Sequence, residues 1–173
     1  MNPDYGQRIG LALRAIEQLH ADTSRLLLDF GKTVGPGRFS VFGNYATRDL
    51  KYNVDADSWM AEGVYRYWAS REQLGAVKAL TVCFLAPGIN EPLLLAAQLK
   101  YRMDGTSEMK SVCKEWDLWR LFFDWSDRPR MEEVIAFAGA DRGRIENANL
   151  IARPLFAITN VDDVTALMNK VDL

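Results

Sequence analysis

The sequence predicts an α+β fold, a mainly antiparallel sheet of about four or five strands with two long helices and a C-terminal helix packed against it. Three observations carry this prediction. Residues 92–103 alternate between two kinds of side chain, which is the period of a strand. Residues 4–30 and 109–125 instead repeat apolar side chains at helical spacing. Along the chain, the predicted order is a long helix, a strand, a hairpin of strands, a helix and a further strand.

The centre of the predicted sheet is a hairpin of residues 77–86 and 92–103. Its first arm is rich in β-branched and apolar residues and ends at Pro87 and Gly88. The second arm has residues that also favour helices, so a helix over 92–103 stays open as an alternative.

Within this hairpin the apolar pattern predicts the strand register. Setting Phe84 opposite Leu95 and Leu80 opposite Leu99 gathers the large apolar groups on one face. Leu99 then belongs to the core, and the alternate residues of the second arm face the other way.

The first half of the chain supplies one helix and two further strands. The helix covers 4–30, and Gly31 stands where a C-terminal capping glycine is expected. A short strand is predicted over 38–45. The aromatic-rich stretch 59–70 favours a strand beginning near Gly63, with a helix as the alternative.

The second half begins with the apolar helix 109–125, followed by a short helix at 131–138. Residues 149–159 are typical of a strand, and Pro154 belongs at a sheet edge or a bulge. The last helix is predicted to begin at Asn160, with acidic residues in its first turn.

Composition narrows the class of protein. A chain of 173 residues, 49% hydrophobic, can form one domain with a full core, so residues 1–173 are expected to be a single domain. A net charge of −2 makes a nucleic-acid partner unlikely. The sequence has no apolar run of bilayer length and no signal-peptide pattern at its start, so we expect a cytoplasmic protein without a membrane partner.

Several short patterns suggest small ligands, and each has a simpler structural explanation. Gly31-Lys32-Thr33 lacks the preceding strand and the additional glycine of a phosphate loop. Glu17 and His20 have the spacing of a helical metal site but occur only once. The pair Asp55 and Asp57 is more typical of a turn or a helix cap than of a magnesium site. No metal or cofactor is therefore expected.

One enzymatic hypothesis comes from the element order, which resembles the core of restriction-endonuclease-like nucleases. Gln98 and Lys100 have the spacing of the acidic-or-glutamine residue and lysine of that superfamily. The resemblance implies a Mg²⁺-dependent nuclease in which Gln98 and Lys100 act with Glu62 or Glu17. The strand before them contains no aspartate, which departs from the superfamily's pattern.

The hypothesis favoured over that enzyme is a non-catalytic protein-interaction module of bacterial type, such as an immunity, chaperone or adaptor protein. The aromatic helix 109–125 is expected to hold the binding surface and to join two copies as a homodimer. A third hypothesis is a small-molecule domain with an aromatic pocket. The candidate binding residues are Trp116, Trp119, Phe122 and Trp125 for the protein partner, and Trp59, Tyr65, Tyr67 and Trp68 for the pocket.

Overall fold

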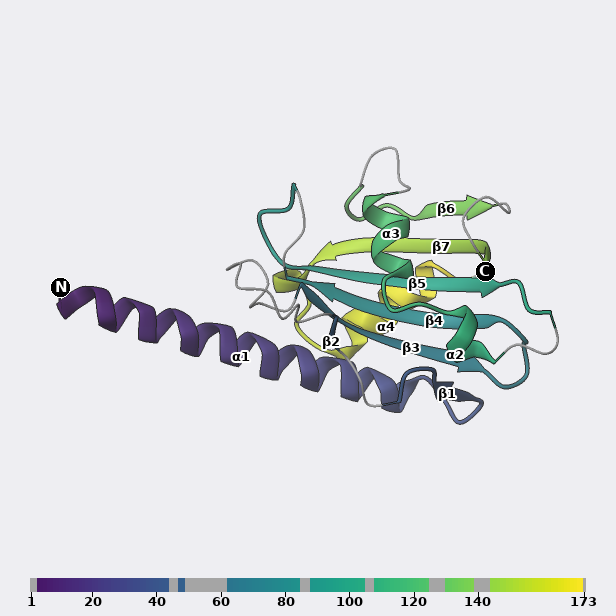
Figure 1. Cartoon of the computed structure of the whole chain (residues 1–173), viewed down its shortest axis with the longest axis horizontal. Coiled ribbons are helices and arrows are strands. Elements are labelled where there is room, and N and C mark those ends of the chain that lie inside the picture. The colour runs from purple at the N-terminus through teal and green to yellow at the C-terminus, as the bar shows by residue number, and fades with distance from the viewer. Residues whose placement is uncertain are drawn as a thin grey trace.

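A computed structural model describes residues 3–43, 47–48, 62–84, 88–104, 108–124, 130–138 and 144–172. In this part of the chain a seven-stranded sheet has the order β1-β3-β4-β5-β7-β6, with β2 also pairing with β3. All strand pairs are antiparallel. The fold is therefore α+β, as the sequence predicts, with a larger sheet than expected (Figure 1).

The helices and strands have the following bounds. The strands are β1 (Arg38–Ser40), β2 (Thr47–Arg48), β3 (Gly63–Ser70), β4 (Ala76–Cys83), β5 (Leu93–Tyr101), β6 (Ile135–Ala138) and β7 (Ile145–Pro154). The α-helices are α1 (Pro3–Thr33), α2 (Met109–Val112), α3 (Asp117–Phe123) and α4 (Val161–Lys170), and a single 3₁₀ turn spans Leu155–Ala157.

The sheet is covered on both faces, which gives it two apolar cores. One face packs against α2 and α3, and its core contains Leu95, Leu99 and Phe122. The other face packs against α4 and the C-terminal half of α1, with Leu80 and Leu94 at its centre. Because both faces are buried, the three central strands β3, β4 and β5 contain almost no exposed side chain.

Several predicted elements are confirmed. Residues 92–103 form a strand, β5, and the strand predicted to begin near Gly63 begins there. The last helix is capped by Asn160, whose side chain accepts hydrogen bonds from the backbone N–H groups of Asp162 and Asp163. The carboxylate of Asp163 accepts in return from the N–H of Asn160, which completes a capping box.

The predicted hairpin register is wrong by three residues. Leu99 lies opposite Val77 rather than Leu80, and Leu95 lies opposite Thr81 rather than Phe84. The prediction gathered the large apolar groups on one face and expected the other face to be small and polar at one end and apolar only at the other. In the structure Leu80 faces α1 and α4 while Leu99 faces α3, so each face has its own apolar set and the pattern does not select a register.

The predicted helix 109–125 is two short helices, α2 and α3, in its described residues. Cys113 has an extended backbone, with φ of −77° and ψ of 139°, and breaks the helical path. Asp117 then starts α3, where its buried carboxylate accepts hydrogen bonds from Tyr101 Oη at 2.7 Å and from the backbone N–H of Lys114 at 2.8 Å. These tertiary contacts override the apolar periodicity.

Four other elements differ from expectation. The short helix predicted at 131–138 is instead a strand, β6, over residues 135–138. It pairs with β7 at the edge of the sheet, and its Ile135 and Phe137 pack into the core under α3. The strand predicted at 149–159 begins earlier and ends at Pro154, which cannot extend a ladder. Helix α1 continues past Gly31 to Thr33, and β1 is shorter than the predicted 38–45.

Candidate functional site

The long helix α1 carries one apolar seam along its whole described length. Its residues follow one another at alternating spacings of four and three, which keeps them on one side of a helix. The seam consists of Ile9, Leu13, Ile16, His20, Thr23, Leu27 and Phe30.

Only the C-terminal half of this seam is covered. Thr23, Leu27 and Phe30 are between 2% and 3% exposed and lie against the sheet and α4. In the N-terminal half, Ile9 is 46% exposed and Leu13 is 61% exposed. Figure 1 shows the reason, because α1 extends well beyond the end of the sheet.

The boundary between the two halves is at His20. Its ring lies 4.6 Å from the ring of Phe84, the residue that follows β4. Residues 6–19 therefore form a free half of α1, with an apolar seam that the described part of the chain leaves open.

A groove begins at Leu19, where the free half ends, and runs beside the C-terminal half of α1, where the helix passes the segment that joins β7 to α4. It has a volume of about 600 Å³. Leu19 and Leu26 form one wall, and Ile158 and Val161 form the other. Phe156 stands at this groove with 69% of its surface exposed, the largest exposure among the described large apolar residues. The walls of this groove therefore add apolar surface beside the seam of α1.

The charges of α1 differ between its halves. In the C-terminal half Asp22 accepts a hydrogen bond from Gln18 and pairs with Arg25, and Asp29 pairs with Lys32. In the free half, Arg14 and Glu17 form no ion pair with the described residues. The flank of the free seam therefore keeps unneutralised charge.

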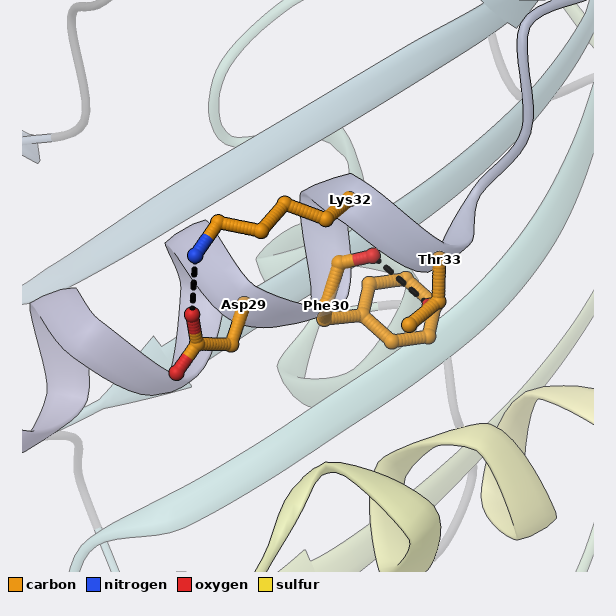
Figure 2. A network of polar contacts seen from close by, with 4 residues as sticks. All are labelled: Asp29, Phe30, Lys32 and Thr33. Atoms are coloured by element: carbon orange, nitrogen blue, oxygen red, sulfur yellow. Dashed lines mark hydrogen bonds and ion pairs between the residues drawn. The ribbon is translucent and has the colours of Figure 1, made fainter.

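The Gly31-Lys32-Thr33 pattern is the last turn of α1 and has the geometry of a helix end. Lys32 Nζ lies 2.6 Å from Asp29 Oδ1, and Thr33 Oγ1 donates to the carbonyl oxygen of Phe30 at 2.8 Å (Figure 2). Both side chains point back along the helix, so they do not form a phosphate cradle.

The residues of the nuclease hypothesis lie far apart. Lys100 pairs with Ala76 at one end of β4, where its Nζ donates to the carbonyl oxygen of Leu74 at 2.6 Å. Glu62 is at the opposite end, where its carbonyl oxygen accepts from the N–H of Phe84. Glu17 is one turn before His20, near that same opposite end. Gln98 is buried, and its Oε1 has no hydrogen-bond partner in the described structure.

Among the described residues, no group of three or more histidine, cysteine, aspartate or glutamate side chains comes together to hold a metal ion. Asp55 and Asp57 lie outside the described residues. No described helix has both the length and the apolar character needed to cross a membrane.

The candidate aromatic pocket is divided between the two faces of the sheet. Tyr65 and Tyr67 pack with Phe42 on the α3 face. Trp68 packs against Phe30 on the α1 face and lines a separate groove of about 610 Å³ there. Trp59 lies outside the described residues. The cavity beside Tyr65 has a volume of only about 10 Å³, which is room for one water molecule.

The aromatic helix predicted as the interface is largely core. Phe122 is fully buried, and Trp116 and Trp119 are partly exposed. Trp125 lies outside the described residues. Sequence reasoning thus put the binding surface on residues 109–125 and missed the free half of α1, although the seam was readable. Periodicity identifies an apolar face but not whether the same chain covers it.

A buried polar cluster holds α3 on the sheet. Tyr101 Oη donates to Asp117 and accepts from Cys113 Sγ at 3.2 Å. Tyr67 Oη donates to the carbonyl oxygen of Glu115 at 3.1 Å and accepts from the N–H of Leu118 at 3.0 Å. Burial raises the pKa of the Asp117 carboxyl, and the bond from Tyr101 opposes that shift. The cluster is enclosed, so its role is structural.

In comparisons with known proteins, no protein-family model, curated protein or solved structure matches this chain.

Proposed function

We propose that this protein is a non-catalytic protein-interaction module that binds its partner through the free half of α1. The observation that carries the proposal is the change in exposure along one seam, from 2% at Leu27 to 61% at Leu13. The same side of one helix is core in one half and open in the other.

The free energy of exposing this apolar surface to water favours a partner that covers it. Fully burying a leucine or isoleucine side chain contributes about 1.5–3 kcal/mol, so Ile9 and Leu13 together forgo several kcal/mol while open. A free helical segment of about 14 residues is also marginal in water without tertiary packing. A partner that covers the seam would supply both contributions.

The chemistry of the surface specifies the kind of partner. Apolar side chains at alternating spacings of three and four residues are the pattern by which one amphipathic helix packs against another. Immunity, chaperone and adaptor proteins act through such contacts without a reaction, and we propose a function of this type.

A cytoplasmic location is part of the proposal. Cys83 and Cys113 are both buried and form no disulfide. Cysteines without disulfides are the rule in compartments where thiols are kept reduced.

Site-specific photo-crosslinking in cells tests the proposal. A benzophenone amino acid at position 13 lies on the seam, and the same group at position 11 is its matched control. Leu11 is also a leucine, is 56% exposed, and stands on the opposite side of the helix. We expect a discrete protein adduct from position 13 and none from position 11. No adduct from position 13, or equal adducts from both positions, would contradict the proposal.

A further inference from the structure

We propose that the partner of the free half of α1 is the same segment of a second copy, packed antiparallel across a two-fold axis. The inference rests on the proposed function and names the partner. It follows from three properties of the free half. These are the end of its exposed seam at His20, the small residue Gly6 on the seam, and the charge of Glu17 beside the seam.

The direction of the pair follows from the position of the sheet. Beyond His20 the sheet occupies the side of α1 on which a packed helix would lie, because Leu27 and Phe30 are buried in the core that they form with it. A parallel partner helix would have to continue along that side and would meet the sheet. An antiparallel partner leaves the pair at the other end, past the start of α1, so both sheets are cleared.

The register follows from the same boundary. In an antiparallel helix pair the two rows of the seam alternate, so Leu13 faces either Ile9 or Ile16 of the second copy. Facing Ile16 would bring the partner's first turns beyond His20 and onto the sheet. Facing Ile9 ends the contact at His20. The structure therefore favours the pairing of Leu13 with Ile9, which by symmetry occurs twice.

This register matches small residues to large ones. Three residues before Ile9, the seam continues at Gly6, which faces Ile16 of the second copy in the same pairing. A Cβ added at Gly6 would meet nothing within 4 Å. Ile16 can therefore pack over bare backbone, and the two helices can approach closely there.

In the same arrangement Glu17 comes close to a helix N-terminus. Glu17 comes to lie beside the first turn of the partner's α1, which begins at Pro3. A helix N-terminus carries partial positive charge and favours a nearby carboxylate. Glu17 forms no ion pair with the described residues of its own chain, so it is available for this role.

Sedimentation equilibrium of the full chain tests whether the dimer exists. From about 1 to about 100 μM, the mass should rise from that of one 19.6 kDa chain toward twice that value. Leu13→Glu puts a carboxylate into both copies of the contact and should raise the dissociation constant at least about a hundredfold. Leu11→Glu should leave it unchanged. A wild-type chain that stays monomeric, or equal effects of the two substitutions, would overturn the inference.

Cross-linking tests the antiparallel order. Ala12 is one residue from the midpoint of the contact, so its two copies lie near the axis, whereas the two copies of Ala21 lie at opposite ends. Both positions are exposed, and the native Cys83 and Cys113 are buried. A short bis-maleimide should link Ala12→Cys dimers and not Ala21→Cys dimers, and the reverse result would contradict the order.

The photo-crosslinked adduct separates this inference from the proposed function. An adduct of twice the mass of the chain supports both. An adduct with a different protein, together with a monomeric chain in sedimentation, supports the proposed function and overturns the second copy as partner. The absence of any adduct at position 13 overturns both.

Discussion

Replacing Tyr101 with phenylalanine tests the buried cluster that splits the aromatic segment into α2 and α3. The hydroxyl removed is the one that donates to Asp117 Oδ2 at 2.7 Å. Tyr101 is 1% exposed, so water cannot replace the bond. A hydrogen bond to an ionised group contributes about 1.5–3 kcal/mol, and one between neutral groups about 0.5–1.5 kcal/mol. We therefore expect Tyr101→Phe to cost about 2 kcal/mol at neutral pH.

The cost should depend on pH, because the partner titrates. Burial raises the pKa of Asp117 and the Tyr101 hydroxyl lowers it, so the substitution raises that folded-state pKa further. For a raised folded-state pKa, stability is fully present below the ordinary carboxyl pKa and is lost as pH rises through the folded-state value. The cost of Tyr101→Phe should thus fall to about 1 kcal/mol at acidic pH.

Tyr67→Phe is the matched control for this experiment. Tyr67 is equally buried and also bridges the sheet to the start of α3, but its hydroxyl bonds to backbone groups of Glu115 and Leu118 and not to the Asp117 carboxylate. Its cost, about 1 kcal/mol, should be the same at both pH values. Urea titrations of both variants at acidic and neutral pH make the comparison. Equal costs that do not change with pH would refute the reasoning about Asp117.

Three further predictions follow from single contacts. Gln98→Met should raise the free energy of unfolding by about 1 kcal/mol, because a buried, unpaired Oε1 is removed. A loss of stability in urea would contradict this. Glu132 has a φ of +64°, so Glu132→Gly should be about 1 kcal/mol more stable than Glu132→Ala, since both lose the ion pair with Arg153. Equal thermal midpoints would show no strain at this position. ATP should give no binding heat in calorimetry, because Lys32 is paired with Asp29 at a helix end. Micromolar binding that Lys32→Ala abolishes would overturn this.

The sequence was sufficient for the elements whose signals are local. The capping box at Asn160 needs only three residues, and the strand beginning at Gly63 follows from β-branched and aromatic residues in alternation. The strand at 92–103 was predicted against its helix propensity because its alternation is strict. These signals do not depend on what the element packs against.

The failures have two physical causes. The first is that burial of both sheet faces removes the contrast between apolar and polar faces, and the second is contact between residues distant in sequence. The hairpin register was wrong because Leu80 and Leu99 are both buried, on opposite faces. The helix 109–125 was overextended because its break depends on Tyr101, a residue distant in sequence that bonds to Asp117. Such contacts cannot be read from local periodicity.

The candidate surface was missed for a related reason. Ile9, Leu13 and Ile16 repeat the alternating spacing of four and three residues that Thr23, Leu27 and Phe30 show, so the sequence shows one continuous amphipathic helix. The sheet covers the seam of α1 only as far as Phe84, which lies beside His20, and this limit depends on the length of the sheet. The aromatic excess in 109–125, which suggested an interface, instead supplies the core under α3.

The central claim is that a second copy, and not the body of the chain, covers the free half of α1. Hydrogen exchange measured by mass spectrometry across a range of protein concentrations tests it directly. We expect protection of residues 6–19 to increase with concentration in the wild type and in Leu11→Glu, to be absent in Leu13→Glu, and to stay constant in residues 23–33. Protection of residues 6–19 that is the same at every concentration and in all three proteins would contradict the claim.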